Sequence, residues 1–131
     1  MSIRDLIPRD KHDLDSVCKL QQHSAVEIAE ILPELFEWLQ DINWPVSKEL
    51  TKALPKYGNI LIPHIERALR SGDPQWQFSM MQFFIRELPK ETSLLVGDTI
   101  QRIADTPTQS EILEGIHLLA RETLQIIGQK Y

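Results

Sequence analysis

Residues 32–43 read LPELFEWLQDIN, and residues 62–73 read IPHIERALRSGD. The two stretches realign at a spacing of about 30 residues, and each opens with an aliphatic residue before proline and carries apolar residues at helical spacing. Restarts at Pro45, Pro74 and Pro107 follow at similar intervals. Such spacings are typical of α-solenoids, in which each helical hairpin buries its apolar face on its neighbours. The alternative is an irregular helical bundle whose proline caps coincide by chance.

Apolar residues recur at helical spacing along almost the whole chain, and no segment shows the sustained alternation of a half-buried strand. The pattern predicts an all-α fold, specifically a HEAT-like α-solenoid of stacked antiparallel helix pairs with about seven helices. At 131 residues, with 42% hydrophobic and 25% charged side chains, the chain has the size and composition of one globular unit. We expect a single helical-repeat domain over residues 1–131.

Capping residues predict where the first helices begin. After an extended arm that carries Leu6, either Asp10 or Asp13 is expected to cap a short helix with Cys18 on its apolar side.

A longer helix should follow. Ser24 and Glu27 form a capping box, and the helix that they start is expected to run to about Gln40. Pro33 should kink this helix or restart it near Leu32, because proline clashes with the carbonyl group four residues earlier.

The remaining helices are expected at short intervals. Asn43 or Trp44 should cap the next one and Asn59 the one after it. The helix over residues 76–88 is apolar nearly all round, which predicts a central position.

A second capping box, at Thr108 and Glu111, predicts a last helix that reaches about Gln129. Its expected apolar stripe is Ile112, Ile116, Leu119, Ala120, Thr123 and Ile127.

Charge and hydropathy exclude several classes of function. The formal net charge of −5 argues against a nucleic-acid partner, since that binding depends on cations that neutralise phosphates. The longest apolar runs have three or four residues, too few for a membrane span or a secretory leader. A cytoplasmic location is therefore expected. Cys18 is the only cysteine, so no internal disulfide can form.

Recognisable catalytic motifs are missing from the sequence, which has no nucleophile elbow, phosphate-cradling glycine loop or paired-cysteine zinc motif. His12, His23, His64 and His117 lie far apart, and no two have the helical spacing of metal ligands. We therefore expect no catalytic residue, no metal and no cofactor, and a non-enzymatic role is favoured.

Two motifs are similar to those of a bacterial family, domain of unknown function 5071. They are residues 6–13, LIPRDKHD, and residues 35–46, LFEWLQDINWPV. Trp76, just after Asp73 and Pro74, also resembles the family, whereas residues 77–78 (Gln-Phe) depart from it where a basic residue and tyrosine are expected. The resemblance covers nearly the whole chain. It implies a compact HEAT-like helical domain and no particular activity.

Acidic residues form a stripe opposite the apolar face of the second helix, because steps of three and four residues keep them on one side. The stripe consists of Glu27, Glu30, Glu34, Glu37 and Asp41, with no base between them. It is either a solvated face or a docking surface for a basic protein. Trp38 and Trp44 flank the end of the stripe, and they are either interface anchors or structural staples.

The leading hypothesis is a non-enzymatic protein–protein interaction module, with another protein, complementary in charge and therefore basic, as its partner. An immunity or antitoxin-like protein is one specific version. The contact surface is placed on the acidic helix face and on the segment from Trp38 to Pro45. Its candidate residues are Glu34, Glu37, Trp38, Asp41, Asn43 and Trp44.

The alternative is a small-molecule binder or an enzyme with a groove near Asp10, Lys11, Asp41, Asn43 and Trp44. In that hypothesis residues 10–13, including Asp13, either cap the first helix or form one wall of the groove. A nucleic-acid-binding helical repeat, which needs a basic groove, is the least favoured class.

Overall fold

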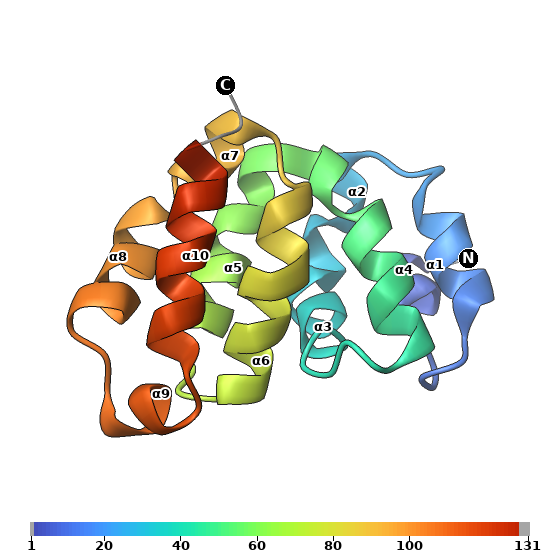
Figure 1. The fold of residues 1–131 in the computed structure, drawn as a ribbon. Helices are drawn as coiled ribbons and strands as arrows, with labels where there is room; N and C mark the ends of the chain where they lie inside the picture. The colour runs from blue at the N-terminus through green and yellow to red at the C-terminus, as the bar shows by residue number, and fades with distance from the viewer. Residues whose placement is uncertain (1, 129–131) are drawn as a thin grey trace.

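Helices make up the regular structure of the computed structural model, which describes residues 2–128 (Figure 1). Within this range the chain forms no strand, so the all-α prediction is confirmed. The α-helices are α1 (Leu14–Leu20), α2 (Ala25–Ile28), α3 (Leu32–Glu37), α4 (Pro45–Ala53), α5 (Ile62–Leu69), α6 (Pro74–Ser79), α7 (Lys90–Leu94), α8 (Gly97–Asp105), α9 (Gln109–Leu113) and α10 (Ile116–Gly128). The 3-10 segments η1 (Ile3–Leu6), η2 (Ala29–Ile31), η3 (Pro55–Leu61) and η5 (Ile85–Glu87) and the π segment η4 (Met80–Phe84) extend or link them.

The described residues therefore hold ten α-helices, more than the number of about seven expected from the sequence. Proline and glycine explain most of the difference, because they divide stretches that the apolar pattern makes look continuous.

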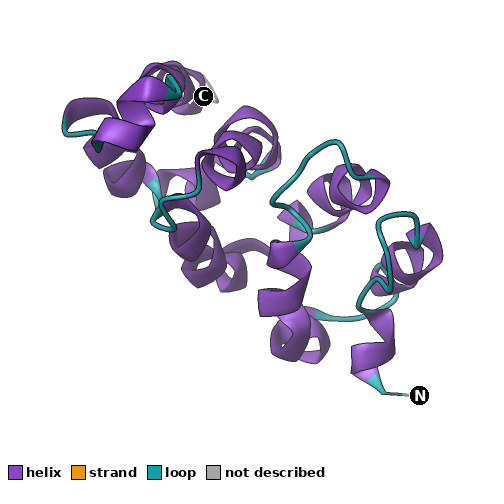
Figure 2. Cartoon of the chain, turned by 90° about the horizontal axis from the view of Figure 1, so that it is seen from below, coloured by secondary structure: helices purple, strands orange, loops and turns teal. Residues whose placement is uncertain are grey.

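The helices lie in two layers, with the two ends of the chain at opposite ends of the molecule (Figure 2). In one layer α1 contacts α4, α4 contacts η4, and α6 contacts α10. In the other layer α3 contacts α5, and α5 contacts α8. Contacts of α5 with α6 and of α8 with α10 join the layers, so each layer covers the apolar face of the other.

The hydrophobic core is centred on the contact between the layers. Phe36 of α3 and Phe84 of η4 are fully buried, and their ring centroids lie 5.4 Å apart in an edge-on arrangement. His64 of α5 stacks on Phe36, also with a centroid distance of 5.4 Å. The continuous rod formed by α6, η4 and η5 contacts α4, α5 and α10, which confirms the central position predicted for this segment.

The arm before α1 is not fully extended, contrary to the prediction. Its first part is η1, which begins with a capping box. The hydroxyl of Ser2 accepts a hydrogen bond from the backbone N–H of Arg4, and the Asp5 carboxylate accepts one from the backbone N–H of Ser2. This turn places Leu6 in the core.

Pro33 restarts its helix as predicted. α2 ends at Ile28, η2 forms a tighter turn, and α3 begins at Leu32 with proline in its first turn. The capping box of Ser24 and Glu27 is present at the start of α2.

The prediction that Asn59 caps the next helix is wrong. α5 begins at Ile62, with Leu61 at its N-cap position, and Gly58 has a left-handed φ of 69° inside η3. Pro63 disfavours an earlier α-helical turn, because its ring would clash with the carbonyl group of residue 59.

The last predicted helix is divided in two. Gly115 has a φ of 71°, which ends α9 and redirects the chain into α10. Ile112, expected in the apolar stripe, is consequently 50% exposed, whereas Ile116 and Ile127 are buried. The expected helix end near Gln129 lies outside the described residues.

A π turn interrupts the central rod. In η4 the backbone N–H of Ile85 donates to the carbonyl oxygen of Met80, five residues earlier. Phe78 and Phe83, which an α-helix would set about 140° apart, form an edge-on pair with centroids 5.9 Å apart. Phe83 is 37% exposed, although the sequence placed it in an all-round apolar helix.

We predict that Phe84→Ala lowers the free energy of unfolding by about 3 to 5 kcal/mol, because it leaves a cavity beside Phe36. Urea unfolding monitored by circular dichroism would measure the loss. Phe83→Ala is the matched control and should cost less than about 2 kcal/mol, since its ring is already partly in water. Equal losses for the two variants would contradict a core centred on Phe84.

Candidate functional site

Two tryptophans meet where α3 gives way to α4. Trp38 follows the last residue of α3, and Trp44 is the N-cap residue of α4, directly before Pro45. Their ring centroids lie 5.5 Å apart in an edge-on arrangement. Both rings are half-buried and pack against the core, so each presents one part to the interior and another to the surface.

A surface depression of about 390 Å³ lies beside this pair, and we call it the Trp depression. Its lining residues are Ile7, Pro8, Glu34, Glu37, Trp38 and Trp44. The structure therefore brings four of the six candidate contact residues to one place. The chain before α1 supplies the opposite wall, which the sequence pattern of α3 gave no means to predict.

Of the two carboxylates in the depression, Glu34 is the one that a close ion pair holds in place. Its Oε1 accepts a hydrogen bond of 2.9 Å from Nη2 of Arg4, and this interaction lowers the pKa of Glu34. Its Oε2 is buried and has no hydrogen-bond partner among the described residues. Glu30, one turn earlier, lies 3.9 Å from the same guanidinium group.

Glu37 is the freer carboxylate. Its side chain is 60% exposed, and its Oε1 lies 4.0 Å from Nη2 of Arg67 in α5. Arg67 also donates to the carbonyl oxygen of Pro33 and lies over the Trp76 ring at 5.3 Å from its centroid. The acidic stripe is thus partly neutralised by arginines from other elements, which the helical pattern alone did not show.

Asp41 and Asn43 do not line the depression and instead form the turn before α4. The Asp41 carboxylate accepts a hydrogen bond of 2.9 Å from the backbone of Asn43, and its carbonyl oxygen accepts one from the backbone of Trp44. This bonding fixes the turn before α4. Asn43 itself lines a different groove.

The residues of the alternative groove are engaged mainly in local structure. Asp13 caps α1 by accepting hydrogen bonds from the backbone and the hydroxyl of Ser16, and Asp10 accepts one from the backbone of His12. The carbonyl oxygen of Lys11 accepts a hydrogen bond of 3.0 Å from the backbone of Val46. Residues 10–13 thus lie against the start of α4, with Asp13 rather than Asp10 as the cap.

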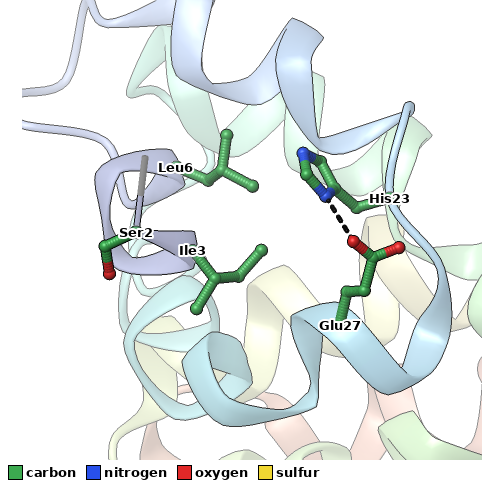
Figure 3. Close-up of a pocket in the computed structure, with 5 residues that line it drawn as sticks. All are labelled: Ser2, Ile3, Leu6, His23 and Glu27. Atoms are coloured by element: carbon green, nitrogen blue, oxygen red, sulfur yellow. Dashed lines mark hydrogen bonds and ion pairs between the residues drawn. The ribbon is translucent and has the colours of Figure 1, made fainter.

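A smaller pocket of about 240 Å³ lies between η1 and the start of α2 (Figure 3). His23 and Glu27 lie together on one side of it, with Nδ1 and Oε2 3.0 Å apart, while the hydroxyl of Ser2 points away from them. That hydroxyl is engaged in the η1 cap, so the three side chains do not form a nucleophile–base–acid triad.

The sequence did not predict a groove of about 490 Å³ between α4 and the second half of the central rod, which we call the α4 groove. Its lining residues are Ile42, Asn43, Lys48, Thr51, Lys52, Gln82, Phe83, Arg86 and Glu87. The only sign of this groove in the sequence is the pair Lys48 and Lys52, which lie one helical turn apart on α4. Only the three-dimensional structure shows that they lie close to Arg86, which is more than thirty positions away in the sequence.

Gln77 has a structural role. Its amide donates to the carbonyl oxygen of Leu69 and, at 2.7 Å, to the carboxylate of Glu111. Burial opposes the ionisation of Glu111, but hydrogen bonds from Arg102, Thr108 and Gln77 outweigh this effect and lower its pKa. This buried network secures α9 against α6 and α8.

Other site types gain no support from the described side chains. Cys18 is exposed, contrary to the expected apolar side, because α1 buries Ser16, Val17 and Leu20 instead. No group of three or more His, Cys, Asp or Glu residues within 2–128 is arranged to hold a metal ion. Across the same range, no helix has the length and apolar character needed to cross a membrane.

Comparison with known families gives a match over most of the chain. The model of the family described as "Domain of unknown function (DUF5071)" matches residues 6–124, which confirms the resemblance seen in the sequence motifs. No match was found among curated proteins.

The Glu27 carboxylate provides a test of pH dependence. Hydrogen bonds from Ser24 and His23 lower its pKa from 4.5 to about 2, so its stabilising effect is present above pH 4.5 and is lost as the pH falls toward 2. We predict that Glu27→Gln is less stable than the wild type near neutral pH and that the difference shrinks over that acid range. Urea midpoints at a series of pH values would measure it. A difference that does not change with pH would contradict this assignment, and Glu114→Gln, which removes an exposed carboxylate, is the control.

Proposed function

The chain belongs to the DUF5071 family, whose description assigns no activity, and we propose that it is a non-enzymatic protein-binding module. The Trp depression is the proposed contact surface. One observation carries the proposal: two half-buried tryptophans and two carboxylates line one depression, together with Ile7 and Pro8 from a distant part of the sequence. Amphipathic aromatic rings of this kind are common interface anchors.

The proposed scaffold is a single HEAT-like α-solenoid of stacked antiparallel helix pairs, acting in the cytoplasm. The two layers of helices and the sequence repeat at a spacing of about 30 residues support the solenoid. Repeats of this type bind partners through extended surfaces, and the Trp depression lies at the junction of α3 and α4.

The chemistry of the depression favours a partner segment with a basic side chain next to an apolar one. Glu37 is largely exposed, and its contact with Arg67 is long, so it is free to pair with an incoming cation. Glu34, which is paired with Arg4, adds a second carboxylate to the lining. Ile7, Pro8 and the tryptophan rings offer the apolar contact. Electrostatic attraction would mainly speed association, and ring burial would supply most of the affinity.

We predict that Trp44→Ala weakens partner binding by about 2 kcal/mol or more, because the variant loses an interface anchor. Affinity capture from the native host with mass spectrometry would identify the partner, and titration calorimetry with purified proteins would measure its affinity. The variant should remain folded with a loss of about 1 to 2 kcal/mol in stability, since only part of the ring is buried. Leu118→Ala, which trims an exposed apolar side chain on α10, is the control. Unchanged affinity per folded Trp44→Ala molecule would rule out this surface.

Glu37→Gln tests the electrostatic contribution separately. It removes the charge of an exposed side chain while keeping its shape, so stability should change by less than about 0.5 kcal/mol. Binding of the identified partner should weaken and become less dependent on salt concentration. Glu114→Gln removes a carboxylate elsewhere and should change neither property. If both variants change the salt dependence equally, the effect comes from net charge and not from the depression.

A further inference from the structure

The α4 groove has a charge that contrasts with the rest of the molecule. Lys48, Lys52 and Arg86 line it together with one carboxylate, that of Glu87, while Glu49 and Glu122 lie beside Lys52 and Arg86; the whole chain carries a net charge of −5. Its volume of about 490 Å³ lies within the usual range for a small-molecule site. Three cations that converge on one concave surface can attract an anion.

Arg86 is held in a fixed position at this groove. Its Nε donates to the carbonyl oxygen of Met81 at 3.1 Å, and its Nη2 lies 3.4 Å from Oε1 of Gln82 and 3.3 Å from the carboxylate of Glu122. The side chain is 22% exposed, and its Nη1 forms no hydrogen bond with the described residues. A guanidinium group fixed in this way loses little entropy when it binds an oxyanion.

The two lysines are available for a ligand. Within residues 2–128, Lys48 forms no ion pair, and Lys52 lies 3.6 Å from Glu49 with its side chain largely in water. An exposed pair of this kind contributes little stability, so an anion of higher charge can replace the carboxylate. Asn43 and Gln82 add amide donors to the same groove.

Phe83 supplies an aromatic wall. The π turn of η4 brings it beside Phe78 on the surface of the rod, where it remains partly exposed and lines the groove. π turns inside α-helices occur frequently at functional sites. An exposed phenylalanine ring offers a stacking surface for a planar ligand.

We propose that the α4 groove binds a small phosphate ester that carries a planar ring, with the size and chemistry of a mononucleotide. The phosphate pairs with Lys48, Lys52 and Arg86, and the ring packs on Phe83. A phosphate monoester has close to two negative charges, which suits three cations better than a single peptide carboxylate does. The net charge of −5 disfavours a long nucleic acid, whose binding needs many cations along an extended surface.

Isothermal titration of the full chain with adenosine monophosphate tests the proposal. Ribose 5-phosphate, adenosine, inorganic phosphate, hexaglutamate and a single-stranded oligonucleotide are the comparison ligands. Saturable binding of adenosine monophosphate is expected, tighter than that of any comparison ligand. Absence of saturable binding would overturn the proposal, and so would tighter binding of hexaglutamate or of the oligonucleotide.

Two variants and one control assign the binding to the groove. Lys48→Gln with Lys52→Gln should weaken adenosine monophosphate binding at least about tenfold. Lys19→Gln with Lys56→Gln, which removes two exposed lysines elsewhere, should leave it unchanged. Phe83→Ala should reduce the preference for adenosine monophosphate over ribose 5-phosphate while leaving ribose 5-phosphate binding in place. Equal weakening by the two lysine pairs, or an unchanged preference in Phe83→Ala, would refute the groove as the site. None of these variants alters the Trp depression, so this result is independent of the proposed protein partner.

Discussion

The contact of Phe36 with Phe84 and His64 is the interaction on which the arrangement of the helices depends. It joins α3, the central rod and α5, and therefore both layers, at one buried point. Phe36 lies two residues before Trp38, so this buried contact stands close to the end of α3 and to the tryptophan that reaches the surface. A substitution that leaves a cavity at this point would also disturb the Trp depression through the end of α3, since close-packed cores transmit strain.

Surface charge depends on the tertiary structure more than on the pattern of any single helix. α3 and the turn before it carry a row of carboxylates, yet Arg4 from η1 and Arg67 from α5 lie against that row. Two lysines of α4 gain a third cation, Arg86, from the central rod. The surface around α3 is thus less acidic than its sequence suggests. The α4 groove, in contrast, is lined by three cations although the whole chain has a net negative charge.

Local rules predicted much of the fold. The capping boxes at Ser24 and Thr108 and the restart at Pro33 follow from hydrogen bonding and steric clash within a few residues, and they are present as predicted. The division at Gly115 was not predicted, because a glycine in an apolar pattern is compatible with either a helix interior or a left-handed turn. Grouping Glu34, Glu37, Trp38 and Trp44 needed only their proximity in the sequence, whereas the wall formed by residues 7–8 and the whole α4 groove depend on contacts between distant segments.

The turn from Asp41 to Trp44 divides its side chains between two surfaces. Trp44 lines the Trp depression, and Asn43 lines the α4 groove. Backbone hydrogen bonds to Asp41 and Lys11 hold the turn in place and so fix the distance between the two surfaces. A substitution that deforms this turn would disturb both surfaces at once. Glu37 and Lys48 lie instead on regular helices at either side of it, so each changes the charge of one surface while leaving the backbone of the other intact.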